Sequence, residues 1–295
     1  MTLFKICLGV FIGMFFVGSP VFAAEKSIYP TSTCGGEGDS TDGFLITGFQ
    51  EYPPFSWPEI NEKKFGNKEY HGFVPSFVKK ALNNMQVVRI KDLFFDDFQQ
   101  TQKAMLHGKA DMLFTSYYID DTKSGQDYVY PAYFGNPFIV VSRATKKIDV
   151  NDVSGLKGLK GVVRREEEVE SLIRGILPTD TKLEVVDGPE EAFRKLLSGE
   201  VDFMISSPYA TDAEARRFKI KDKLHYGTKV LRHIKYFIAF SKLSRCRKYK
   251  KIFSEKFAEQ LKDKAEMEKI LQKYIQKWAD LHQDEPPLEY TPAKD

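Results

Sequence analysis

The chain has 295 residues, 42% of them hydrophobic, and its 44 basic residues against 41 acidic ones leave a formal net charge of +3. Acidic and basic residues are interleaved, so the composition does not indicate a nucleic-acid-binding protein. The densest basic run, residues 245–251, opens a stretch with amphipathic helical spacing, which a solvated helix face explains. The length allows one large domain or two modest ones, each with its own core.

The N-terminal segment 1–24 has the features of a secretory signal peptide. Lys5 precedes an uncharged apolar run from Ile6 to about Val17, which is too short to span a bilayer. Small residues then permit cleavage after Ala23 or Ala24. We therefore expect an exported protein located in the periplasm.

Two cysteines lie beyond the expected cleavage site, Cys34 and Cys246. An even number of cysteines in an oxidising compartment permits one disulfide, which would tie the leader at 25–42 to the base of the C-terminal helices. The 5 histidines show no spacing typical of metal ligands. We expect neither a metal ion nor another cofactor.

After the leader, the pattern alternates between strands and helices. We expect strands at about 44–48, 138–142, 182–186 and 233–240, and helices that begin near 72, 97, 166 and 189. Two amphipathic helices follow between about 252 and 278. The loop Tyr52–Trp57 contains two prolines and cannot be helical, so its aromatic rings are held on a stiff extended segment.

Two similar segments, Met105–Ser116 and Leu196–Ser207, indicate a repeated unit. Each reads as a helix end with a Gly, an Asp, and an apolar strand that finishes in hydroxyl side chains. The matching residues are Gly108, Asp111, Thr115 and Ser116 in the first segment and Gly199, Asp202, Ser206 and Ser207 in the second. Because ligands collect at the carboxyl ends of strands in α/β sheets, these hydroxyls are candidate ligand contacts. The repetition suggests two similar lobes that face one cleft.

Five segments occur in the order and spacing typical of one family: Tyr52–Phe55, Gly72–Ala81, Met105–Ser116, Tyr130–Tyr133 and Leu156–Val163. Over about residues 43–282 the chain resembles family 3 of the bacterial solute-binding proteins, the periplasmic receptors of polar amino-acid ABC transporters. The resemblance implies an α/β type II periplasmic-binding-protein fold with two lobes joined by a two-strand hinge. Lobe 1 would comprise 43–137 and 233–284, lobe 2 would comprise 138–232, and 285–295 would form a tail.

The resemblance also implies ligand contacts. Aromatic walls are expected from Tyr52, Trp57 and Phe98, although Trp57 and Phe98 are equally suited to the core. Of the neighbouring Tyr117 and Tyr118, one should face the cleft because side chains alternate along an extended segment, and we assign Tyr118.

Three cations are expected to bind an anionic group. Lys123 stands where the family usually has an Arg that clamps the ligand carboxylate, so the charge is kept but the bidentate fork is lost. Arg164 and Arg165 replace a small glycine- and threonine-rich turn. Ser207 stands where the family tends to have an Asp for the ligand amino group. We therefore expect a ligand with an anionic group and no required α-amino group.

These features predict a monomeric, non-enzymatic solute-binding protein that captures a small polar or anionic solute, amino-acid-like or a carboxylate, for an ABC transporter permease. Two alternatives remain open. One is an enzyme on the same fold, similar to periplasmic cyclohexadienyl dehydratases. The other is a ligand-sensing partner of a membrane receptor.

Overall fold

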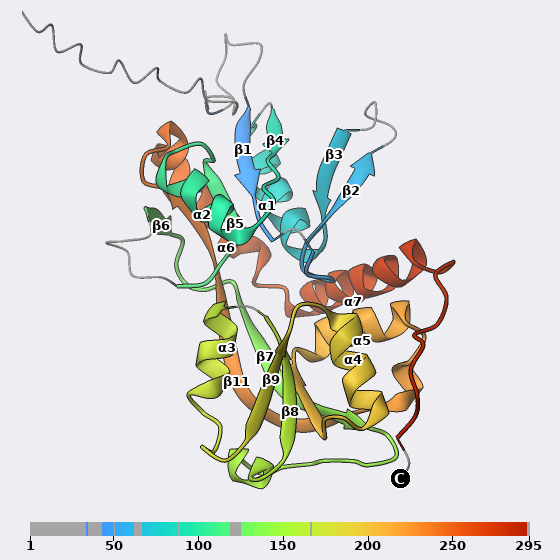
Figure 1. Ribbon diagram of the computed structural model, residues 1–295. Helices are drawn as coiled ribbons and strands as arrows, with labels where there is room; N and C mark the ends of the chain where they lie inside the picture. Colours follow the sequence, from blue (N-terminus) through green and yellow to red (C-terminus); the bar gives the residue numbers. More distant parts are fainter. Residues whose placement is uncertain are drawn as a thin grey trace, which may run out of the picture. The chain divides into compact units, whose positions relative to one another are not determined.

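The computed structural model describes residues 34, 43–49, 51–61, 67–87, 89–118, 125–165 and 167–293. Two α/β lobes are built from these residues (Figure 1). The expected signal peptide and, apart from Cys34, the leader at 25–42 lie outside them. None of the helices in this part of the chain combines the length and the apolar character needed to cross a membrane.

The main sheet of lobe 1 contains three parallel strands and one strand that crosses to lobe 2. The parallel strand that comes second in the chain lies at the edge, followed by the first, the third and the crossing strand. In spatial order these are β4 (Ile90–Asp92), β1 (Phe44–Thr47), β5 (Met112–Ser116) and β11 (Leu224–Ser241), with β6 (Gln126–Tyr128) also paired to β11. The first three are parallel, and β11 is antiparallel to β5. A separate antiparallel pair joins β2 (Trp57–Asn61) to β3 (Asn67–His71).

The sheet of lobe 2 repeats this order. It contains β9 (Lys182–Val186), β8 (Lys160–Arg164), β10 (Phe203–Ser206) and β7 (Phe134–Arg143). The first three are parallel, and β7 is antiparallel to β10. Strands β7 and β11 also pair with each other and cross between the lobes. The predicted α/β fold with two lobes and two crossing strands is therefore confirmed.

Helices cover both sheets. Lobe 1 carries α1 (Phe73–Asn84), α2 (Phe98–Leu106), α6 (Lys250–Gln260) and α7 (Lys264–Leu281), and lobe 2 carries α3 (Glu167–Arg174), α4 (Pro189–Ser198) and α5 (Pro208–Arg217). The two C-terminal helices bury the expected apolar stripes, with Phe253 and Phe257 stacked one turn apart. Ile252, where the expected amphipathic stretch begins, is exposed because it precedes the buried face by one residue.

The two repeated segments have the same conformation in both lobes. A glycine with positive φ follows each helix, with φ of 67° at Gly108 after the C-cap of α2 and 79° at Gly199, the C-cap of α4. Glycine adopts this conformation without steric cost. An aspartate three residues later precedes the third strand of its lobe: Asp111 before β5 and Asp202 before β10.

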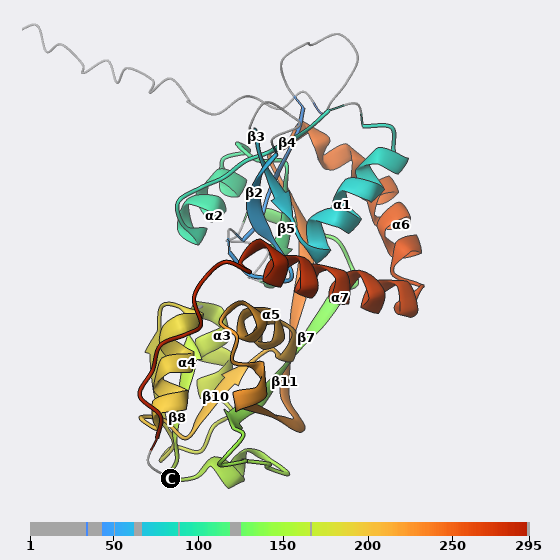
Figure 2. The same ribbon diagram turned by 90° about the vertical axis from the view of Figure 1, so that its right-hand side faces the viewer.

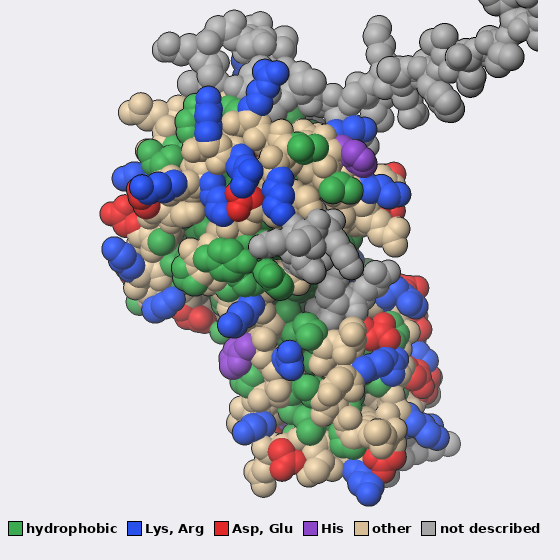
Figure 3. Space-filling model, turned by 90° about the vertical axis from the view of Figure 1, so that its left-hand side faces the viewer, with side chains coloured by type: hydrophobic (Ala, Val, Ile, Leu, Met, Phe, Trp, Pro, Cys, Tyr) green, Lys and Arg blue, Asp and Glu red, His purple; other side chains and the backbone are tan. Residues whose placement is uncertain are grey.

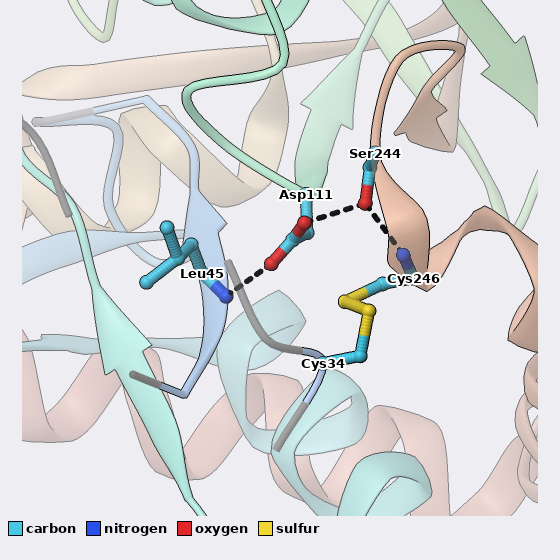
Figure 4. Close-up of a disulfide and its surroundings, with 5 residues drawn as sticks. All are labelled: Cys34, Leu45, Asp111, Ser244 and Cys246. Atoms are coloured by element: carbon cyan, nitrogen blue, oxygen red, sulfur yellow. Dashed lines mark hydrogen bonds between the residues drawn. A yellow bond between two sulfur atoms is a disulfide. The ribbon is translucent and has the colours of Figure 1, made fainter. Parts of the chain in front are cut away.

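Asp111 joins three parts of lobe 1 (Figure 4). Its carboxylate accepts a hydrogen bond of 2.8 Å from the Leu45 amide on β1 and another from the Ser244 hydroxyl, which follows β11. The Ser244 hydroxyl in turn accepts from the Cys246 amide at 2.9 Å. The buried carboxylate thus fixes the first, third and crossing strands relative to one another.

Asp202 makes the equivalent contacts in lobe 2. It accepts from the Lys160 amide on β8 at 3.0 Å and pairs with Lys146, which follows β7, also at 3.0 Å. The repeated Asp therefore has the same structural role in each lobe. It precedes the third strand and hydrogen-bonds both to the first strand and to the segment that follows the crossing strand.

A disulfide joins Cys34 to Cys246, with the two Cα atoms 5.0 Å apart (Figure 4). This is the pair that the cysteine content suggested. Cys246 lies in the 3-10 helix η4 (Arg245–Tyr249), which leads directly into α6. Both cysteines are buried. The bond therefore holds residue 34 against the base of the C-terminal helices.

The basic run at 245–251 lies on the surface of lobe 1, over η4 and the start of α6, where lysine and arginine side chains gather (Figure 3). Arg247 and Lys250 both pair with Asp127 on β6. Phe253, further along the same helix, is fully buried. The run thus has one buried and one solvated face, as its spacing indicates.

The segment after α7 runs along lobe 2 (Figure 2). The Leu288 amide donates to the Phe218 carbonyl at 3.1 Å, and the Ala293 amide donates to the Leu197 carbonyl at 3.2 Å. The Leu288 side chain is buried in the core cluster of lobe 2. The C-terminal segment therefore adds a third connection between the lobes beside β7 and β11.

Candidate functional site

The candidate site lies where the loop after β1 meets the carboxyl ends of β8 and β10. A partly open cavity of about 40 Å³, here called the interlobe cavity, lies at this junction. Lobe 1 contributes Tyr52 and Pro53 to its wall, and lobe 2 contributes polar side chains from three elements. These are Arg164 on β8, Ser206 on β10, and Thr211 and Glu214 on α5. Parallel strands that end at one edge bring these groups together.

A buried hydrogen-bonded chain connects the two lobes beside this cavity. The Asn136 amide on crossing strand β7 donates to the Tyr52 hydroxyl at 3.0 Å. The Ser207 hydroxyl, at the start of α5, donates to the Asn136 carbonyl oxygen at 2.6 Å. Sequence analysis missed Asn136, although a polar amide two residues before the expected strand at 138–142 was the available signal.

Five aromatic side chains form a second part of the site, here called the aromatic cluster: Phe49, Tyr52, Phe98, Tyr117 and Tyr236. Phe49 lies 5.0 Å from Phe98 and 5.5 Å from Tyr117 between ring centroids. The Tyr117 and Tyr236 hydroxyls are 3.2 Å apart. Of the predicted aromatic walls, Tyr52 and Phe98 thus belong to one cluster, which presents phenolic hydroxyls among apolar rings.

The first pair of predicted hydroxyls is engaged within lobe 1. The Thr115 hydroxyl accepts from the Phe49 amide at 2.8 Å, and the Ser116 hydroxyl donates to the Gln126 side chain at 2.6 Å. Both side chains are buried. They position the loop after β1 and strand β6 rather than line the interlobe cavity. In the second pair, Ser206 lines that cavity and Ser207 bonds to Asn136.

Trp57 lies in the core instead of along the interlobe cavity. Its ring is 5.2 Å from Trp278 and 5.8 Å from Tyr274, both on α7. Ala213 of α5 belongs to the same buried cluster. The placement follows from β2, which begins at Trp57 and directs its ring toward the C-terminal helix.

The predicted cations differ in position. Arg164 lines the interlobe cavity and donates to the Glu51 carbonyl at 3.0 Å. Arg165 is exposed and pairs with Asp187 at 2.6 Å. Lys123 lies outside the described residues. Arg164 is therefore the predicted anion partner that the described part of the chain brings to the cavity.

A larger groove of about 780 Å³ lies between the lobes beside the crossing strands, here called the hinge groove. It is lined by Tyr117, Tyr118, Ser171, Leu172 and the β11 residues 232–237 except Tyr236. Tyr118 is 57% exposed, with its ring 5.4 Å from that of Tyr128. Because Tyr117 belongs to both the groove and the aromatic cluster, the groove borders that cluster. Its volume is within the range of small-molecule sites.

Glu214 is the carboxylate that sequence analysis missed. Its side chain is buried, and no hydrogen-bond partner of normal geometry reaches either oxygen within the described residues. Arg217 lies one turn away, with its guanidinium 3.5 Å from the carboxylate. Burial raises the pKa of Glu214 to about 7, although the charge of Arg217, the nearby indole N–H of Trp278 and the charge of Arg164 oppose the shift. The sequence of α5 is rich in charged residues and lacks an apolar stripe, so we predicted neither the helix nor its buried carboxylate.

No protein-family model and no curated protein matches the chain. Solved structures do. An amino-acid ABC transporter substrate-binding protein from Streptococcus pneumoniae, bound to L-arginine, is 16% identical with a TM-score of 0.61 over 80% of this chain and 95% of that one. The ligand-binding core of GluR0 with L-glutamate is 13% identical, with a TM-score of 0.63 over 82% and 100%. A histidine kinase sensor domain similar to periplasmic binding proteins is 18% identical, with a TM-score of 0.60 over 79% and 95%. At these identities the similarity shows a shared two-lobed fold.

Proposed function

We propose that this protein is an exported, periplasmic solute-binding protein that closes its lobes around a small polar solute and presents it to the permease of an ABC transporter. The observation that carries this proposal is the junction itself. The carboxyl ends of β8 and β10 meet the Tyr52 loop of the other lobe there, beside two antiparallel crossing strands. An amino-acid-like or carboxylate solute fits its mixture of aromatic rings, hydroxyls and charges.

Closure needs no chemistry in this proposal. The solute enters through the hinge groove, stacks against the aromatic cluster and contacts both lobes, so that its binding favours the closed state. An anionic group of the solute would be bound by Arg164 with help from Lys123. The Tyr52–Asn136–Ser207 chain holds the two walls of the site in register through the crossing strand.

An enzyme on this fold is the second candidate. A buried carboxyl with a pKa of about 7, such as Glu214, has the property that a general acid requires near neutral pH. Incubation with prephenate or arogenate, followed by product analysis, distinguishes turnover from binding. A sensor would bind its solute equally well but leave solute uptake unchanged when its gene is deleted.

The proposed function is tested on the mature protein in two steps. A thermal-shift screen of amino acids and small carboxylates identifies solutes that raise the melting temperature, because a solute at about a hundred times its Kd stabilises the folded state by roughly 2.7 kcal/mol. Small-angle scattering then compares a stabilising solute with a non-stabilising one of similar size. We expect a smaller radius of gyration with the first alone. No stabilising solute, or an unchanged radius with a saturating one, argues against the proposal.

A further inference from the structure

We propose that the interlobe cavity is a subsite for a terminal ammonium or guanidinium group of the solute, with the Glu214 carboxylate as its counter-ion. The inference rests on the proposed function and narrows its substrate class. It starts from the burial of Glu214, whose residue is 4% exposed and which lines the cavity. Taking a carboxylate out of water without a hydrogen-bond donor is costly, and native proteins leave few such groups.

A second acceptor faces the same space. Thr211 lies one turn before Glu214 on α5 and also lines the cavity. Its hydroxyl has no hydrogen-bond partner in the part of the chain that the structure describes. The Glu214 carboxylate accepts hydrogen bonds and the Thr211 hydroxyl is able to accept one, so one group with several donors would satisfy both. An ammonium group has three and a guanidinium group has five.

The nearest cation to Glu214 is shared with other carboxylates. Three carboxylates approach Arg217: Glu285 at 2.8 Å, Glu214 at 3.5 Å and Glu51 at 3.7 Å. Arg164 is the second guanidinium near Glu214 and lines the cavity. Arg217 hydrogen-bonds to Glu285 but not to Glu214. Among these carboxylates, Glu214 is the buried one, and neither of its oxygens accepts a hydrogen bond of normal geometry from the described residues.

The size and walls of the cavity fit the end of a chain rather than a whole solute. Its volume of about 40 Å³ exceeds the roughly 10–15 Å³ needed to hold a water-sized group but is too small for an entire amino acid. Tyr52 from lobe 1 forms part of the wall, and its ring offers a cation a favourable face. A cation between Tyr52 and Glu214 would contact both lobes at once.

The subsite is tested with pairs of probes that share their shape and differ in charge. L-arginine is compared with L-citrulline, and L-lysine with L-norleucine, by calorimetry on the mature protein. We expect the cationic member of at least one pair to bind on the order of 30-fold more tightly than its neutral partner, as a buried charge pair supports. In Glu214→Gln, which keeps the side-chain size, that preference should fall to a few-fold at most.

Two further variants separate contact from folding and from long-range charge. Glu285→Gln removes another carboxylate beside Arg217 that does not line the cavity, so it should keep the preference for the cation. Thr211→Val keeps the shape of α5 and should weaken the cation several-fold, which tests the subsite if Glu214→Gln folds poorly.

Equal affinities within both pairs, or an unchanged preference in Glu214→Gln, would overturn the subsite. If a neutral or anionic solute closes the lobes without dependence on Glu214, the subsite is wrong and the proposed function stands. If no solute of any charge binds, the proposed function fails and the subsite fails with it.

Discussion

Replacing Glu214 by Gln should change how the stability of the protein depends on pH. Burial raises the pKa of the Glu214 carboxyl from 4.5 to about 7, against the opposing charge of Arg217. The folded protein thus holds this proton more tightly than the unfolded chain does, and ionisation destabilises the fold. The contribution of this carboxyl to stability is fully present below about pH 4.5 and is lost as the pH rises through about 7.

The magnitude follows from the same interval. A rise in pKa from 4.5 to about 7 corresponds to about 3 kcal/mol of unfolding free energy. Urea unfolding of the solute-free protein at fixed ionic strength, in steps between pH 5 and 8, measures it. The wild type should lose up to about 3 kcal/mol more across this range than Glu214→Gln, which cannot ionise. Glu190→Gln is the matched control, because Glu190 is exposed on α4 and pairs with Arg194.

A constant difference between wild type and Glu214→Gln at every pH would refute this reasoning. It would mean that the carboxyl keeps an ordinary pKa in the folded protein, and therefore that it is in contact with water or with a donor. The argument for a cation subsite would then lose its first observation as well.

Three further predictions concern the frame of the site. In the mature protein, changing Cys34 and Cys246 together to Ala should lower the unfolding free energy by roughly 2–5 kcal/mol. Thiol titration of the unfolded, unreduced mature wild type should find no reactive thiol. In urea unfolding, Asp111→Ala should lower the unfolding free energy by roughly 2–4 kcal/mol and Asp202→Ala by about 1 kcal/mol. The difference is expected because the Asp111 carboxylate is fully buried and that of Asp202 is partly exposed. Equal losses of stability would contradict this reasoning. Asn136→Ala should weaken solute binding about tenfold in calorimetry, because it removes the hydrogen bonds that join Tyr52 to Ser207 across the site. If the variant binds with wild-type affinity, these hydrogen bonds contribute to stability alone.

The two-lobed fold was predictable because its signals are local. A Gly that ends a helix and an Asp that precedes a buried strand are read from a few neighbouring residues, and the structure gives both a role in each lobe. The orientation of side chains at the strand ends was not predictable in the same way. Strand β5 is buried throughout, so its hydroxyls find partners in their own lobe, and the sequence does not indicate which face meets the solute.

Long-range contacts account for the other differences. Trp57 belongs to an aromatic loop that fits a ligand site, yet α7 returns from the far end of the chain and buries its ring. Glu214 lies in a helix whose composition is that of a surface segment, and it is buried because the lobes meet over it. Neither environment can be inferred from residues nearby in the sequence, since each depends on an element more than fifty residues away.

The two sides of the lobe junction differ in what their separation would cost. On one side α5 packs against α7, with Ala213 in a buried cluster with Trp57 and Trp278, and the C-terminal segment continues onto lobe 2. Separating the lobes there would expose parts of two indole rings to water, at a free-energy cost on the order of a few kcal/mol. On the other side lies the hinge groove, where Tyr118 is already exposed and residues of both lobes line open space. The side with less buried apolar area is the one that opens at lower cost, so the lobes should part along the groove rather than along the contact between α5 and α7.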